Sequence, residues 1–144
     1  MSLNSAQTES LAVVLRRLEH ALLQLRQNLR RPPEPGWLTH YTPIAPEITE
    51  RLGARIEPML AEIERLADAF DLQPEAVDLQ RQAASEMVVA WADLTDTLSP
   101  KLRRYGPVDP ALAQSLDPHL RALIQQTSEI GQLLARQAGA PGGS

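Results

Sequence analysis

Six leucines near the N-terminus recur at intervals of four and three residues: Leu11, Leu15, Leu18, Leu22, Leu25 and Leu29. Each residue of an α-helix turns the chain by about 100°, so this spacing places all six side chains on one narrow stripe. An apolar stripe of this kind needs another apolar surface to pack against. The stripe therefore predicts a helix over residues 5–29, with Ser5 or Thr8 as its N-cap, in a fold where helices pack on helices.

Prolines indicate where the other helices begin and end, because a proline is tolerated in a linker or in the first turn of a helix. They bound a second helix over residues 46–70 and a third over 74–98, which has the widest apolar arc of the chain. Asp109-Pro110 and Asp117-Pro118 combine a cap with a first-turn proline and predict a short helix followed by a fourth long one. Pro58 lies inside the second helix, where it either bends the helix or divides it.

These four long helices predict an all-α four-helix bundle, with one domain over residues 1–138 and a disordered tail at 139–144. The short connection at residues 71–74 favours an antiparallel hairpin of the second and third helices. The long proline-rich connection between the first two helices allows two topologies. It can fold back to give antiparallel neighbours, which is the default, or run the length of the bundle in an up-up-down-down arrangement.

Composition excludes several classes of function. The chain has no cysteine, which rules out disulfides and cysteine nucleophiles and suits a reducing compartment. A net charge of −4 argues against a nucleic-acid-binding surface. The longest apolar run, residues 87–92, is far shorter than a membrane span, and the first basic residue comes too late for a signal peptide. We expect a cytoplasmic protein that binds neither nucleic acid nor membrane.

The proline-rich connection is the best candidate for a binding element. Trp37, Leu38 and Tyr41 concentrate apolar bulk in a segment whose prolines restrict the backbone, and stiff exposed aromatics make good anchors for a protein partner. The alternative is that Trp37 and Tyr41 lie across the end of the bundle and seal its core. Arg103 and Arg104, in a basic turn after the third helix, either contact a partner or form a solvated helix end.

The third helix carries more apolar surface than one bundle core normally covers. Surplus apolar surface of this kind often ends in an interface between identical chains. We therefore expect a homodimer, with the interface formed by Val77, Ala84, Val88 and Trp91. Small and polar residues at core positions, among them Gln80, Thr127 and Gly131, either shape an internal pocket or serve packing and helix register.

An enzyme is the competing interpretation. Carboxylates on the second and third helices, with Glu62 and Glu86 as the candidate ligands, could hold Mg²⁺ between facing helices. The acidic stretch 61–69 resembles the first acidic helix of MazG-type pyrophosphohydrolases, a resemblance that implies metal-dependent cleavage of nucleotides. The chain departs from that pattern, because the paired glutamates are absent and Val89 stands where the family has an aspartate.

No other pattern of nucleophiles, metal ligands or phosphate-binding loops stands out, and the three histidines are scattered along the sequence. The sequence therefore favours a protein without a cofactor that works through contacts with other proteins, as an assembly factor, an adaptor or a regulatory subunit.

Overall fold

A computed structural model describes residues 2–139, and every regular element in that range is helical. The elements are α1 (Ser5–Arg30), α2 (Pro46–Ala69), α3 (Leu79–Thr95), the 3₁₀ helix η1 (Ser99–Tyr105), α4 (Leu112–Ser115) and α5 (Asp117–Gly139). The all-α class is therefore confirmed. None of the helices within residues 2–139 is both long and apolar enough to cross a lipid bilayer. Beyond Gly139, the predicted tail lies outside the described residues.

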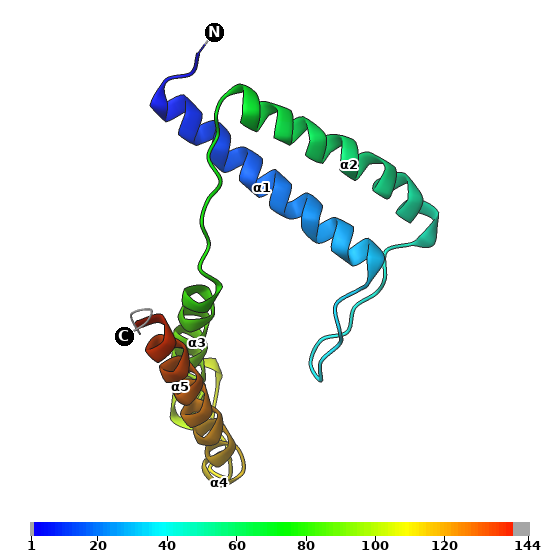
Figure 1. Cartoon of the computed structure of the whole chain (residues 1–144). Helices are drawn as coiled ribbons and strands as arrows, with labels where there is room; N and C mark the ends of the chain where they lie inside the picture. The colour runs from blue at the N-terminus through cyan, green and yellow to red at the C-terminus, as the bar shows by residue number, and fades with distance from the viewer. Residues whose placement is uncertain (1, 140–144) are drawn as a thin grey trace. The chain divides into compact units, whose positions relative to one another are not determined.

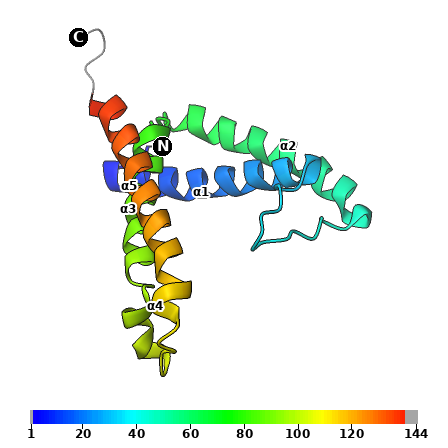
Figure 2. The same cartoon turned by 90° about the horizontal axis from the view of Figure 1, so that it is seen from below.

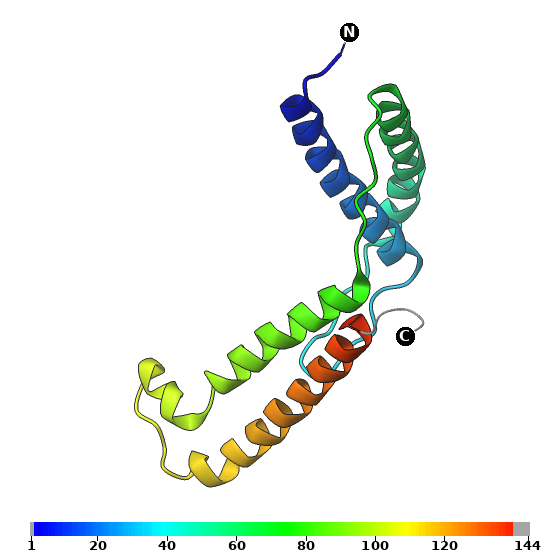
Figure 3. The same ribbon diagram turned by 60° about the vertical axis from the view of Figure 1, so that its left-hand side comes forward.

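The chain divides into two compact units, Met1–Glu75 and Ala76–Ser144, and each is built on a pair of antiparallel helices. In the first unit, α1 runs alongside α2 in the opposite direction (Figures 1 and 3). The loop between them folds back, as the default topology requires, and it is well separated from the helices in Figure 2. The core of this unit consists of Leu22, Ile56 and Ile63, flanked by Leu15, Leu25, Leu29 and Leu60.

The second unit pairs α3 with α5, and the four-residue α4 packs against α5 as well (Figure 3). Leu120 of α5 is buried, whereas no residue of α3, which lies wholly within the described range, is buried. One apolar seam thus holds this hairpin together. The surplus apolar arc of α3 stays at the surface of the unit, where Val88 is 66% exposed and Trp91 is 44% exposed.

The predicted start of α1 at Ser5 is confirmed, whereas its predicted N-cap and the predicted start of α3 were wrong. α1 is capped by Asn4, whose side chain accepts from the N–H of Gln7 while the Gln7 side chain accepts from the N–H of Asn4. α3 begins at Leu79 rather than at Pro74, because the carboxylate of Asp78 accepts from two first-turn N–H groups, at 3.0 and 3.2 Å. Residues 74–78 are therefore not helical.

α2 is continuous through Pro58, so the proline does not divide the helix. The helix ends where Asp71 adopts a left-handed conformation, with φ at 51°, and the N–H of Leu72 returns to the carbonyl of Ala67 at 2.9 Å. This pattern is a Schellman-type ending, in which a residue with positive φ satisfies the last carbonyls of a helix. Aspartate tolerates that conformation better than most residues.

The connection between α2 and α3 spans residues 70–78, so it is longer than the sequence predicted. Arg16 of α1 holds its first part, donating to the carbonyl of Gln73 at 2.9 Å. The helix that packs on α3 within its own unit is α5, not α2. The all-helical chain is thus established, while the closed four-helix bundle and the single domain over residues 1–138 stay predictions.

Truncation of Ile56, which is 2% exposed at the centre of the α1–α2 core, tests this packing. We expect Ile56→Ala to lower the free energy of unfolding by about 2–4 kcal/mol, because it removes buried methyl groups and leaves a cavity. Ile48→Ala is the matched control on the same helix, since Ile48 is 45% exposed; its cost should be about 1 kcal/mol or less. Urea titration followed by circular dichroism measures both, and equal costs would contradict the packing described.

Candidate protein-binding surfaces

The loop between α1 and α2 presents two apolar side chains at its tip. The N–H of Gly36 donates to the carbonyl of Thr39 at 3.1 Å and closes a tight turn around Trp37 and Leu38. Within the structure Trp37 is 100% exposed and Leu38 is 98% exposed. Neither residue packs on the α1–α2 core, so the alternative in which Trp37 seals that core is not what the structure shows.

The loop has two arms, residues 31–35 before the tip and residues 40–45 after it, and several features restrict them. Prolines at 32, 33, 35 and 43 restrict the backbone, and Arg31 pairs with Glu34 at 3.2 Å. Tyr41 lies with Pro43 and the first arm around a shallow hollow, which leaves the tyrosine 48% exposed. Restricted arms reduce the conformational entropy that the tip would lose on binding.

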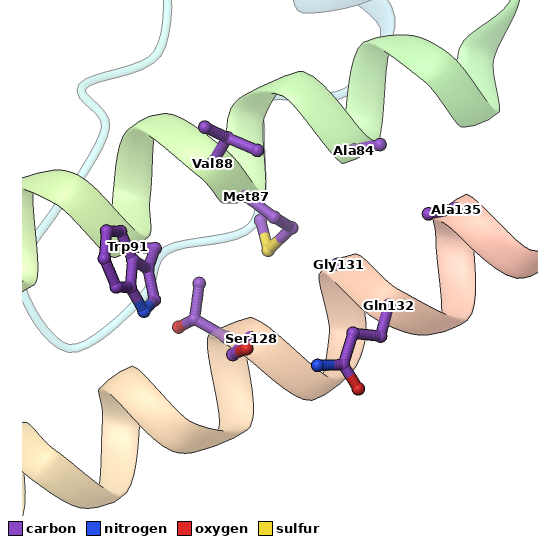
Figure 4. Close-up of a pocket in the computed structure, with 9 residues that line it drawn as sticks. Ala84, Met87, Val88, Trp91, Ser128, Gly131, Gln132 and Ala135 are labelled. Atoms are coloured by element: carbon purple, nitrogen blue, oxygen red, sulfur yellow. The ribbon is translucent and has the colours of Figure 1, made fainter.

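An apolar groove runs between α3 and α5 of the second unit (Figure 4). It has a volume of about 310 Å³, and α3 contributes Ala84, Met87, Val88 and Trp91. Three of these were predicted as an oligomer interface, and the structure brings them together on one flank of α3. The fourth predicted residue, Val77, lies before α3 in the 70–78 connection and is 58% exposed. The opposite wall comes from α5, namely Thr127, Ser128, Gly131, Gln132 and Ala135.

Sequence reasoning named Thr127 and Gly131 but missed the rest of the α5 wall. In the sequence, Ser128, Gln132 and Ala135 have the pattern of ordinary surface residues beside the leucine and isoleucine positions of that helix. Only the pairing of α5 with α3 shows that they line one groove. For Gly131 the sequence left open a pocket-shaping role or a packing role. A Cβ atom at this position would meet the Cβ of Met87 at 3.8 Å, an ordinary contact distance.

Gln80 fixes the register of α3 against α5. Its side-chain amide donates to the main-chain carbonyl of Leu134 at 2.7 Å, in a partly buried position. A polar side chain that finds a partner on the neighbouring helix favours one alignment of the two helices over others, because any slip leaves a buried polar group unpaired. The groove walls are therefore held in a defined alignment.

A buried carboxylate, that of Asp117, lies at the end of the α3–α5 hairpin where α5 begins. Asp117, predicted to cap the fourth long helix, accepts instead from the hydroxyl of Ser99 at 2.6 Å and from the N–H of Ser99 at 2.8 Å. The first N–H groups of α5 go to the carbonyl of Leu116. Asp117 is 3% exposed and Ser99 is 5% exposed. The pair thus links the start of η1 to the start of α5.

The hydroxyl of Ser99, and then its main-chain N–H, hold the pKa of Asp117 below its ordinary value of 3.8. Arg121 lowers the pKa slightly further, while desolvation of the carboxylate acts in the opposite direction. Hydrogen bonds to the charged form thus outweigh burial. The sequence did not predict this contact. Asp117 and Ser99 lie 18 positions apart, and no sequence pattern around either residue indicates that the two meet.

One arginine of the basic turn, Arg104, makes contacts with neighbouring residues of the chain. Arg104 donates to the carbonyl of Asp96 at the end of α3, at 3.1 Å, and its guanidinium lies 5.3 Å from the centre of the Tyr105 ring. The first contact is typical of a cation that stabilises a helix C-terminus, and the second is a cation–π contact within the basic turn. Arg103 is exposed on the same turn. The structure therefore gives Arg104 a local role that the sequence had left open.

The two carboxylates proposed as metal ligands, Glu62 and Glu86, belong to different units of the chain. Glu62 accepts from Arg65, one turn further along α2, with 2.8 Å from its oxygen to the guanidinium Nε. Glu86 lies exposed on α3 in the other unit. Among the described residues, no group of three histidine or acidic side chains is arranged to hold a metal ion.

Comparison with known proteins adds no relative: no family model, curated protein or solved structure matches the chain. The surfaces described above are therefore interpreted from their own geometry and chemistry.

The Asp117–Ser99 contact makes stability depend on pH in a defined direction. Because the pKa of Asp117 is lower in the folded chain, its contribution is fully present above the ordinary value of 3.8 and is lost as the pH falls through the folded value. We expect Asp117→Asn to lower the melting temperature at pH 7. The difference from the unchanged protein should shrink as the pH falls below 4, which thermal unfolding at a series of pH values measures.

Asp93→Asn is the control for that series, because Asp93 is an exposed aspartate on α3. It should leave the melting temperature unchanged at pH 7. A pH-independent difference between Asp117→Asn and the unchanged protein would contradict the assigned role of the carboxylate charge.

Proposed function

We propose that this protein has no enzymatic activity of its own and works through contacts with other proteins, as an assembly factor, an adaptor or a regulatory subunit. The observation that carries the proposal is the loop tip at Trp37 and Leu38. These two large apolar side chains are exposed at the end of a closed turn, on arms restricted by prolines. Exposing these side chains does not stabilise the fold, whereas it makes them available to bind a partner.

The chemistry of the tip favours a protein partner with an apolar pocket. Tryptophan buries a large area at little entropic cost and is enriched among residues that dominate binding energy. The turn between Gly36 and Thr39 restrains the backbone that carries the two side chains, which lowers the entropic cost of association. Residues 36–39 at the tip carry no charged side chain, and the nearest charges on the preceding arm, Arg31 and Glu34, pair with each other.

The proposal includes two further points. The first is self-association through the flank of α3, because Ala84, Val88 and Trp91 lie together at the surface of the second unit. The second is a cytoplasmic place of action, supported by the absence of cysteine from the sequence.

Replacing Trp37 and Leu38 tests the contact. In a pull-down from native cells, proteins retained by the unchanged chain should be lost by Trp37→Ser with Leu38→Ser. Once a partner is identified, titration should show Trp37→Ser weakening binding by about 2 kcal/mol or more, about thirtyfold in affinity, as for a central anchor residue. The helical circular dichroism signal should be unchanged, since neither residue belongs to the core.

Val89→Ser is the matched control, because Val89 is 60% exposed and lies on α3 in the other unit. It should retain the same partner with the same affinity. Retention of every partner by the double loop variant would refute the proposed contact. Binding to neutral lipid vesicles that depends on Trp37 would replace the protein partner with a membrane surface.

A further inference from the structure

A hollow lies between α1 and α2 in the first unit, at the end of the hairpin that carries the loop (Figure 1). Its volume of about 350 Å³ is near the lower limit of the sites that bind small molecules in proteins. The hollow is lined by three residues of α1 and four of α2, namely Arg26, Leu29, Arg30, Thr49, Gly53, Ile56 and Glu57.

The two arginines of the hollow differ in what they contact. Arg26 of α1 pairs with the carboxylate of Glu57 on α2, with 2.8 Å between Nη1 and Oε1. Arg30 lies one turn after Arg26, and because the two helices are antiparallel, the corresponding position on α2 is one turn before Glu57. That position is Gly53. Within the described residues Arg30 makes no ion pair, so a glycine stands where a carboxylate would complete a second pair.

Packing does not account for Gly53. A glycine inside a helix lowers its stability relative to alanine. A Cβ atom at this position would meet no atom within 4 Å, and the backbone of Gly53 does not have a positive φ. Neither a close approach of another segment nor a left-handed conformation therefore requires glycine. Positions that break a local rule without a structural reason are concentrated at functional sites. Here the effect of the glycine is to keep the hollow open opposite Arg30.

The floor and the charges of the hollow define the ligand that fits it. Ile56 is 2% exposed and Leu29 packs on the same core, so the floor is apolar. The hydroxyl of Thr49 donates to the carbonyl of Ala45 at 3.1 Å, which leaves the arginines as the donors.

The charge of the hollow selects among anions. Two arginines and one glutamate leave one positive charge uncompensated, which a single carboxylate matches. A phosphate monoester carries a charge of about −2 at neutral pH and would also be repelled by Glu57.

From these observations we infer that the hollow binds a small organic acid. The carboxylate of the acid pairs with Arg30, in the place that Glu57 takes beside Arg26, and its short apolar body packs on Leu29 and Ile56. This site goes beyond the proposed function and does not depend on it, because no residue of the hollow belongs to the loop tip or to the flank of α3.

Hexanoate is the probe for the site, because it combines one carboxylate with a short apolar chain. In a titration of the full chain followed by amide NMR shifts, we expect saturable changes at residues 26–30 and 49–57 with a dissociation constant in the millimolar range. Hexanol, which lacks the charge, and acetate, which lacks the apolar body, should each bind about tenfold more weakly or worse. Hexanoate shifts that do not saturate, or equal binding of hexanol, would overturn the inference.

Neighbouring arginines provide a matched test of the charge. Arg30→Gln should raise the dissociation constant for hexanoate about tenfold or more, because it removes a charge-assisted hydrogen bond. Arg31→Gln is the control, since Arg31 is the next residue, is also exposed and is not part of the lining. It should leave the constant unchanged. Equal effects of the two variants would show only a general attraction between the anion and the arginines, and would contradict the site.

Filling the hollow tests its shape separately from its charge. Gly53→Leu should abolish saturable binding of hexanoate, because the new side chain occupies the space opposite Arg30. It should also raise the melting temperature, since leucine replaces glycine in a helix without a clash. Ala54→Leu, at an exposed position outside the lining, should leave binding unchanged. A lower melting temperature of Gly53→Leu, or binding that survives in it, would contradict an open hollow at this position.

Discussion

A pair of antiparallel helices has only one seam, and this limit shapes both units of the protein. Each helix can bury the part of its apolar arc that faces its neighbour, and the remainder stays at the surface. Leu22, Ile56 and Ile63 fill the seam of the α1–α2 hairpin, while α3 has no buried residue although its apolar arc is the widest in the chain. The apolar flank at Val88 and Trp91 follows directly from this geometry.

Polar contacts fix how the helices of each hairpin align, because little apolar surface is buried between them. Gln80 bonds to the main chain of Leu134 across the α3–α5 seam, and Asp117 holds Ser99 at the far end of the same hairpin. Arg16 performs a similar role in the first unit by binding the carbonyl of Gln73. Apolar stripes tolerate small slips along their length, whereas these hydrogen bonds have one satisfied alignment. The walls of the groove depend on that alignment.

The exposed loop and the groove are two apolar surfaces with different origins. The groove is a consequence of incomplete packing, because α3 has one neighbouring helix in its unit and no buried residue. The Trp37–Leu38 tip stands away from the α1–α2 core and has a closed turn of its own between Gly36 and Thr39. The flank of α3 proposed for self-association and the two loop residues proposed as anchors belong to different units of the chain. This separation is the basis of the proposed role as an adaptor, assembly factor or regulatory subunit.

The sequence by itself determined the helical class and the approximate position of each long helix, because apolar periodicity and proline positions are local properties. It also singled out Trp37, Leu38, Val88 and Trp91. The tertiary structure alone decided that α3 pairs with α5 in its unit, that Asp117 binds Ser99 rather than capping its own helix, and that small residues of α5 complete the groove. Each of these depends on which distant segments meet, and a periodic stripe states that a helix needs a neighbour without specifying which one.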